Sequence, residues 1–224
     1  NDILLGDELG APGGNDELTG GSGSDVLAGG AGDDKMDGGT EDDLLIGGQG
    51  ADWGNGGTGN DIVFGGSNDD RLMGGDGDDC MAGQGGDDVM FGGNGHDKMT
   101  GGAGDDALYG DAGNDIIAGN AGADYINAGT GNDIAFGGSD EDTIRGFDGH
   151  DTLFGGSGDD AILGQRGRDH LHGDAGNDNL QGGVGEDRRR RLGARPQPGA
   201  QRPLPCRHCQ CDERGRRQMA GAAQ

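Results

Sequence analysis

The chain has 224 residues, of which 57 are Gly and only 33 are Leu, Ile, Val or Phe, and its formal net charge is −26. A chain with so few apolar residues and so much charge cannot bury enough surface to offset the entropy of folding, which excludes an ordinary globular domain with a large core. Residues 1–187 hold 40 acidic and 6 basic residues. This acidic body disfavours nucleic acid and anionic membranes as partners and favours cations, and no apolar run is long enough to insert into a membrane.

The chain opens with a short, irregular segment. Residues 1–5 resemble the end of one repeat unit, and residues 6–10 form a connector without a repeat pattern. The sequence begins at Asn1 with neither Met nor a signal-peptide pattern. We therefore expect it to be a piece of a larger protein.

Residues 11–187 form a tandem repeat with a period of nine residues, without one insertion or deletion. The sixth position is Asp in twenty successive units, the first is Gly in 18 of them, and the fourth is Gly in 17. Solvated acidic turns, in which Asp merely caps the backbone, are the plain alternative, but caps have no reason to recur in perfect phase. A period of this kind is typical of a solenoid.

The eighth position of each unit predicts a core. In nineteen units it is apolar except at Gly54, where we expect a gap in the packing. One inward residue between variable neighbours suits a three-residue strand, and the six Gly-rich residues before it suit a turn. The recurring Gly and the lack of a 3.6-residue period exclude helix.

Winding these units as a coil satisfies both patterns. Two units make one coil, the strands stack into two parallel sheets, and units n and n+2 lie about 4.8 Å apart. The sequence therefore predicts an all-β parallel β-roll, a β-helix-like solenoid of about ten two-turn coils. Stacked carboxylates at this spacing repel one another unless cations lie between them.

The units resemble the repeats-in-toxin (RTX) nonapeptide, Gly-Gly-x-Gly-x-Asp-x-U-x, in which U is a large apolar residue. The resemblance implies Ca²⁺ between turns n and n+2, held by sixth-position carboxylates and backbone carbonyls, as suits an ion that prefers oxygen ligands. Twenty turns leave room for up to about eighteen ions, whose charge of about +36 offsets the body's −34. The implied metal ligands are Asp16, Asp25, Asp34, Asp43, Asp52, Asp61, Asp70, Asp79, Asp88, Asp97, Asp106, Asp115, Asp124, Asp133, Asp142, Asp151, Asp160, Asp169 and Asp178.

A few His and Cys residues fall outside this pattern. His170 and His172 flank an inward Leu and could form a small transition-metal site, but two exposed polar residues are the much plainer explanation. Cys206, Cys209 and Cys211 invite a zinc interpretation, but their spacing is irregular.

Residues 188–224 are basic, with 10 basic and 2 acidic residues, and the Asp/Gly phase disappears within two residues of Asp187. So abrupt a change is what an out-of-frame reading of the repeat codons would give. We expect this tail to lack a fixed fold. It also differs from the C-terminal secretion signal that the resemblance implies.

The sequence shows no nucleophile, base or oxyanion arrangement, so we expect no enzyme activity from this segment itself. The resemblance implies a calcium-binding module of a secreted bacterial protein, exported by type I secretion and folding on Ca²⁺ outside the cell. The alternative is an adhesin stalk, or a carbohydrate-contacting accessory region of an RTX enzyme or toxin whose active part lies upstream. A cell-surface or polysaccharide partner would then be reached through the parent protein. Read along consecutive units, the outward seventh and ninth positions show no ordered ladder of side chains to support this alternative.

Overall fold

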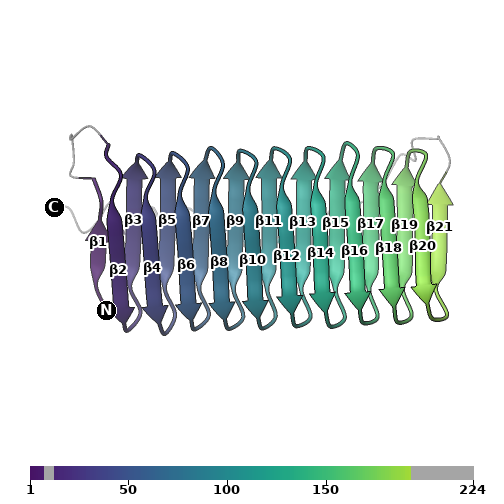
Figure 1. Ribbon diagram of the computed structural model, residues 1–224, viewed down its shortest axis with the longest axis horizontal. Coiled ribbons are helices and arrows are strands. Elements are labelled where there is room, and N and C mark those ends of the chain that lie inside the picture. The colour runs from purple at the N-terminus through teal and green to yellow at the C-terminus, as the bar shows by residue number, and fades with distance from the viewer. Residues whose placement is uncertain (8–12, 193–224) are drawn as a thin grey trace.

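The computed structural model describes residues 1–7 and 13–192, and β-strand is the only regular secondary structure in that part of the chain. Its strands form two long parallel sheets (Figure 1). An eleven-stranded sheet contains β1 (Ile3–Leu5), β3 (Val26–Ala31), β5 (Leu44–Gln49), β7 (Ile62–Ser67), β9 (Cys80–Gly85), β11 (Lys98–Ala103), β13 (Ile116–Ala121), β15 (Ile134–Ser139), β17 (Thr152–Ser157), β19 (His170–Ala175) and β21 (Arg188–Leu192). A ten-stranded sheet contains β2 (Glu17–Ser22), β4 (Lys35–Thr40), β6 (Trp53–Thr58), β8 (Arg71–Asp76), β10 (Val89–Asn94), β12 (Ala107–Ala112), β14 (Tyr125–Thr130), β16 (Thr143–Asp148), β18 (Ala161–Arg166) and β20 (Asn179–Val184).

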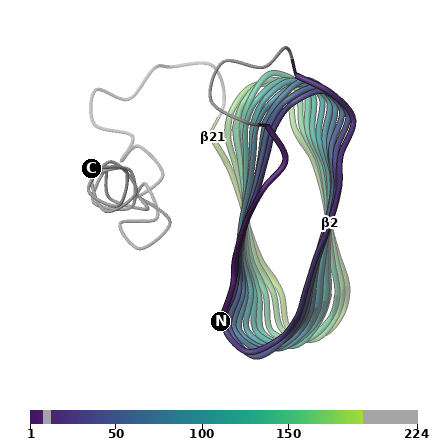
Figure 2. The same cartoon turned by 90° about the vertical axis from the view of Figure 1, so that its left-hand side faces the viewer.

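Consecutive strands alternate between the two sheets, so each strand pairs with the strand two further along. Residues 18 apart therefore lie side by side, as Met81 and Met99 do. Viewed end on, the chain is a flattened coil whose two sheets face each other and are joined by turns at both edges (Figure 2). The predicted parallel β-roll of about ten coils is confirmed.

The predicted division of each unit was wrong. Strands β2 to β20 are six residues long, and only three residues of each unit form the turn. The ladder continues through the Gly pair, where Gly39 lies in register with Gly57. Each residue lies beside the equivalent residue of the next coil. Main-chain hydrogen bonds between the coils therefore continue through the glycines, where the pattern of alternating apolar and polar side chains ends.

The eighth-position side chains fill the space between the sheets, as predicted, and those from Leu27 to Leu171 are fully buried wherever they are apolar. The predicted gap at Gly54 is not present. A Cβ on Gly54 would lie 3.2 Å from Cγ1 of Val63 and 3.3 Å from Cδ2 of Leu72, so the neighbouring side chains already occupy that space.

The sheets extend beyond the predicted end of the repeat. Arg188–Leu192 form β21, which pairs with β19, so the expected loss of fold at residue 188 was wrong for these five residues. Main-chain groups make this ladder, and the Arg side chains from Arg188 to Arg191 are exposed, so the strand needs no apolar residue there. Residues 193–224, which include the three Cys residues considered for zinc, lie outside the described residues. No helix in the described ranges is long and apolar enough to cross a membrane.

Candidate metal sites

The sixth-position Asp residues lie in two rows, one along each edge of the coil, directly before the strands. Each row contains every second unit, so neighbours in a row are 18 residues apart. The side chains from Asp25 to Asp178 are buried, with at most 6% of their surface exposed, whereas Asp16, near the N-terminal end, is half-buried. The fold thus brings all nineteen predicted site residues into these two rows.

A repeating hydrogen bond fixes each carboxylate. The backbone N–H of Asp70 donates to Oδ1 of Asp88 at 2.8 Å, and the same bond recurs for every donor from Asp16 to Asp169, at 2.7 to 3.2 Å. One carboxylate oxygen of each residue is therefore engaged by the turn of unit n−2. The carboxylates are held in fixed orientations between stacked turns.

The second oxygen of each carboxylate has no partner. Among the described residues, Oδ2 of every sixth-position Asp from Asp25 to Asp178 is buried and accepts no hydrogen bond. A single buried, unpaired charged oxygen costs several kcal/mol. Eighteen ionised carboxylates in two rows would strongly oppose folding unless a positive charge lies beside them, and this is the main argument for a metal at a pH where they are ionised.

The first-position glycines leave room beside these oxygens. A Cβ built on Gly20 would lie 2.6 Å from Oδ2 of Asp25 and 2.6 Å from the carbonyl oxygen of Gly38, one coil away. Gly38 has the same surroundings, with Oδ2 of Asp43 at 2.5 Å and the carbonyl oxygen of Gly56 at 2.6 Å from its Cβ position. The same pair, a carboxylate oxygen and a carbonyl oxygen, converges beside most of the first-position glycines in both rows, where any larger side chain would block them.

This donor set fits calcium. In the described ranges no three side chains of Asp, Glu, His or Cys gather at one point, so the shell must combine carboxylates with backbone carbonyls. Ca²⁺ accepts six to eight oxygen ligands in flexible geometry, whereas Mg²⁺ demands a tight octahedron and Zn²⁺ prefers nitrogen or sulfur. When bound, the ion supplies the positive charge that the unpaired oxygens lack.

Burial also shifts the pKa values of these groups. The pKa of Asp70, Asp106, Asp115 and Asp151 is raised to about 7, first because burial disfavours the charged carboxylate and then because neighbouring carboxylates repel it. Without a cation, these groups therefore hold protons near neutral pH. A bound divalent ion would reverse this preference, because it favours the charged form.

Three acidic residues absent from our predicted ligands share the environment of these rows. The N–H of Asp2 donates to Oδ1 of Asp25, so Asp2 begins the row of the eleven-stranded sheet. Oδ1 of Asp187 accepts from Asp169 at 3.2 Å and ends that row. Asp7 accepts a bond of 2.8 Å from the N–H of Ala31. The hydrogen-bond ladder includes Asp2, which is out of phase with the repeat, whereas Asp187 at the other end follows the nonapeptide phase.

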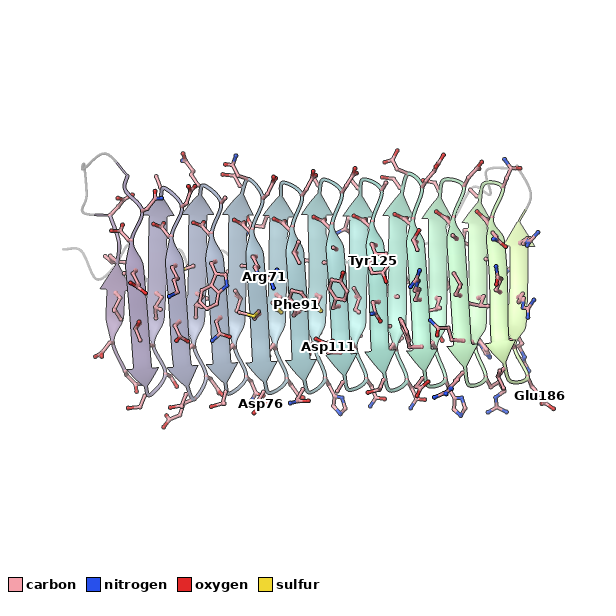
Figure 3. The ribbon with its side chains drawn as sticks, viewed as in Figure 1. Arg71, Asp76, Phe91, Asp111, Tyr125 and Glu186 are labelled. Carbon is pink, nitrogen blue, oxygen red and sulfur yellow. The ribbon has the colours of Figure 1, made fainter. Side chains whose placement is uncertain are left out.

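The outer face of the ten-stranded sheet carries a stacked row of side chains that we did not expect from the sequence. Phe91 stacks on Tyr109 with ring centroids 4.8 Å apart, and Tyr109 lies 5.8 Å from Tyr125. Arg71 covers the ring of Phe91 at 5.0 Å (Figure 3). Arg145 covers that of Tyr125 at 5.5 Å. Its members come from every second unit, because consecutive units lie on opposite sheets, so the row leaves no pattern along consecutive units.

A second row lies on the eleven-stranded sheet. Phe136 stacks on Phe154 at 5.0 Å, and His172 stacks on Phe154 at 4.8 Å. The imidazole of His172 thus ends an aromatic row. Together with His170 it has no third metal-ligating side chain nearby in the described chain.

Comparison with known proteins agrees with the repeat. A family model described as the RTX calcium-binding nonapeptide repeat, in four copies, matches residues 13–45, 46–81, 82–117, 100–135, 109–144, 127–162 and 154–188. These matches run without a gap from residue 13 to residue 188, more than three quarters of the chain. No curated protein matches the chain.

Proposed function

The chain belongs to the family of RTX calcium-binding nonapeptide repeats and is a calcium-binding repeat module, and on that premise we propose that it is a calcium-responsive folding unit of a secreted bacterial protein. The observation that carries the proposal is the set of eighteen buried Oδ2 atoms without partners. The repeat fold is a structural, calcium-binding one.

The ligands that we propose are the sixth-position carboxylates from Asp16 to Asp178, joined by first-position backbone carbonyls. Their two rows place one carboxylate oxygen in each gap between coils, and the Gly carbonyl of the next coil faces it. Asp16 is only half-buried and has one neighbouring turn in its row among the described residues, that of Asp34, so its gap is more open to water than the others. We expect this end to bind its ion most weakly.

Charge and burial explain why folding would follow calcium. Residues 1–187 carry a net charge of −34. Folding buries their sixth-position carboxylates in rows, so these groups repel one another when no metal is bound. An ion that binds only the folded form stabilises it by mass action, and many such ions make the response steep. The chain would stay unfolded at low intracellular Ca²⁺, pass a type I secretion channel and fold outside. The family supports this route.

Circular dichroism of the full chain during a Ca²⁺ titration tests the proposal, with Mg²⁺ as the control ion. We expect a cooperative gain of β signal with Ca²⁺ and little change with Mg²⁺. Limited proteolysis before and after addition of EGTA gives a second measurement. A chain that remained equally compact and protease-resistant in EGTA would rule out calcium-dependent folding.

The aromatic rows favour a second candidate function, contact with a polysaccharide or cell surface. Their composition of Tyr, Phe and Arg is the one enriched at interaction sites, and three of the six basic residues of the body, Lys35, Arg71 and Arg145, each cover an aromatic ring of the ten-stranded sheet. Co-sedimentation of the calcium-loaded chain with insoluble acidic and neutral polysaccharides tests it. Binding that Tyr109→Ala reduces severalfold would support this function, and no binding to either class would count against it.

A further inference from the structure

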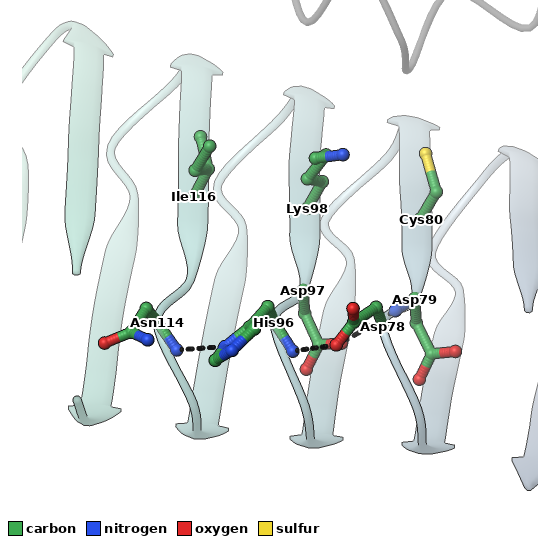
Figure 4. A pocket seen from close by; sticks show the side chains of 8 residues that line it. All are labelled: Asp78, Asp79, Cys80, His96, Asp97, Lys98, Asn114 and Ile116. Atoms are coloured by element: carbon green, nitrogen blue, oxygen red, sulfur yellow. Dashed lines mark hydrogen bonds between the residues drawn. The ribbon is translucent and has the colours of Figure 1, made fainter. Parts of the chain in front are cut away.

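A second hydrogen-bond ladder runs beside the rows of Asp, at the fifth position of each unit. In Figure 4 the N–H of His96 donates to Oδ1 of Asp78 at 2.8 Å, and the N–H of Asn114 donates to Nδ1 of His96 at 2.8 Å. Thirteen bonds of this kind, at 2.7 to 3.0 Å, join fifth positions 18 residues apart. The acceptor is always Asp, Asn or His, whose Oδ1 or Nδ1 lies at the same reach from the backbone.

The other fifth-position residues that face a following turn are Ser24, Ala51, Ala123, Glu141 and Arg168. In the described part of the chain none of them accepts a bond from the turn above, because each lacks an acceptor atom at that reach. The fifth position, variable in the repeat pattern, thus divides the eighteen gaps between turns into thirteen with this bond and five without it. The two His residues of this position, His96 and His150, both act as acceptors.

The two ladders run in opposite directions. The fifth-position N–H donates to the unit 18 residues before it, as Ala51 does to Oδ1 of Asp33 at 3.0 Å. The sixth-position N–H donates to the unit 18 residues after it, as Asp52 does to Oδ1 of Asp70 at 2.8 Å. Two consecutive amides therefore tie each turn to both of its neighbours in the row, and the fifth-position bond lies one residue away from the carboxylate proposed to bind metal.

We propose that the fifth-position Asp, Asn and His are positioning residues for calcium, which hold neighbouring turns at the metal-binding spacing as the coil folds. This inference rests on the function proposed above. A gap whose turns are already tied together loses less conformational freedom when an ion binds, so its affinity is higher. Gaps above Ala51 and Ala123 should therefore bind calcium more weakly than the gaps next to them.

Ala51 offers a direct test, because Trp53, the sole Trp of the chain, lies two residues further on. Light absorbed by Trp53 can excite Tb³⁺, which occupies oxygen-rich calcium sites, so the luminescence reports on gaps near this turn. In the full chain we would titrate Tb³⁺ and displace it with Ca²⁺. Ala51→Asn should restore the missing bond from the N–H of Asp69, whereas Ala51→Ser, with the reach of Ser24, should not.

A second pair of variants separates the hydrogen bond from charge. Asp33→Asn removes the carboxylate charge but keeps the Oδ1 acceptor for the N–H of Ala51, and Asp33→Ala removes both. A hydrogen bond of ordinary strength corresponds to a change of about two- to tenfold in local affinity. We expect Ala51→Asn to bind more tightly than Ala51→Ser by this factor, and Asp33→Asn to bind more tightly than Asp33→Ala.

Equal affinities within either pair would overturn the positioning role. That result differs from failure of the proposed function, which would appear in the unsubstituted chain as no gain of β signal with Ca²⁺ and no luminescence that Ca²⁺ displaces. Circular dichroism of each variant at saturating Ca²⁺ confirms that the coil forms. Position 51 is exposed, so neither of its variants disturbs the core.

Discussion

The backbone N–H of Asp106 donates a hydrogen bond of 2.9 Å to Oδ1 of Asp124, and Oδ2 of Asp124 is buried without a partner. Each Asp in the row is both the donor to the next carboxylate and the bearer of a charge that the next carboxylate repels. The main-chain bond sets the spacing of the row. No group in the described part of the chain offsets the repulsion between carboxylates at that spacing. Metal and protons are therefore competitors for the same oxygen atoms.

This competition predicts a pH dependence. The pKa of Asp106 is raised from 3.8 to about 7 and that of Asp79 to about 8, chiefly by burial. Because the folded-state pKa exceeds the unfolded value, the metal-free fold binds more protons than the unfolded chain between about pH 4 and 8, and its stability falls as pH rises through this window, by about 1.4 kcal/mol per pH unit for each excess proton. In EGTA we expect more β signal at pH 5.5 than at pH 8.

The calcium response should change in the opposite direction. Protons must leave the carboxylates before Ca²⁺ binds, so the midpoint of the Ca²⁺ titration should move to higher concentration as pH falls below about 7. Titrations followed by circular dichroism at pH 5.5 and pH 8 measure this shift. A midpoint independent of pH would show that the carboxylates hold no protons in the metal-free chain over this range.

Asp106→Asn should remove calcium from one part of the row. The amide keeps an oxygen at the position of Oδ1 but carries no charge, so the gaps beside it lose a ligand that Ca²⁺ prefers. We expect one or two fewer bound ions per chain by equilibrium dialysis. At a free Ca²⁺ concentration of 100 times Kd, each lost ion lowers the stability of the loaded chain by about 2.7 kcal/mol.

Asp105→Asn is the matched control for this variant. Asp105 is exposed, its Oδ1 accepts from the N–H of Ala123 at 2.8 Å, and Asn retains that acceptor. The change in formal charge is the same as in Asp106→Asn. If both variants lost the same number of ions, the sixth position would have no special role in binding.

The period of nine predicted the architecture and the two rows of Asp, because a coil of two units forces residues 18 apart to stack. It did not predict six-residue strands, since main-chain pairing continues past Gly38 and Gly39, where side chains carry no signal. The Phe91–Tyr109 row was missed because consecutive units do not share a sheet. The lack of a hydrogen-bond partner at the Oδ2 atoms could not be predicted, because the spacing of residues in the sequence does not fix the orientation of their side chains. The identity of the ligands remains a prediction.

Ala128 is a natural exception that tests the open space beside the carboxylates. It is the first residue of its unit, so its methyl group stands where glycines elsewhere leave room, and Oδ2 of Asp133 in the same unit is buried without a partner. We expect Ala128→Gly to lower the Ca²⁺ midpoint, although Gly costs about 0.5–1 kcal/mol in the metal-free chain. A Ca²⁺ titration of the variant, compared with its stability in EGTA, separates the two effects.

Gly110→Ala is the reverse change one coil away in the same row. A Cβ at residue 110 would lie 2.5 Å from Oδ2 of Asp115 and 3.1 Å from Cδ1 of Ile117, and it would also meet the carbonyl oxygen of Ala128. We expect overpacking of about 1–3 kcal/mol and a higher Ca²⁺ midpoint. Unchanged calcium binding in both variants would mean that the space beside the first-position residue is not part of the site.

Phe147 occupies a second-position site that most units give to Gly, with φ of 71° in the left-handed region. This conformation costs roughly 1–2 kcal/mol for a residue with a Cβ, and Gly has no such steric cost. Phe147→Gly should therefore stabilise the calcium-loaded chain by about 1 kcal/mol relative to Phe147→Ala, because both variants lose the aromatic ring but only Gly relieves the backbone. Urea unfolding at saturating Ca²⁺ measures the difference. Equal midpoints for the two variants would show that the backbone at this turn is not strained, and the left-handed conformation there would need a different explanation.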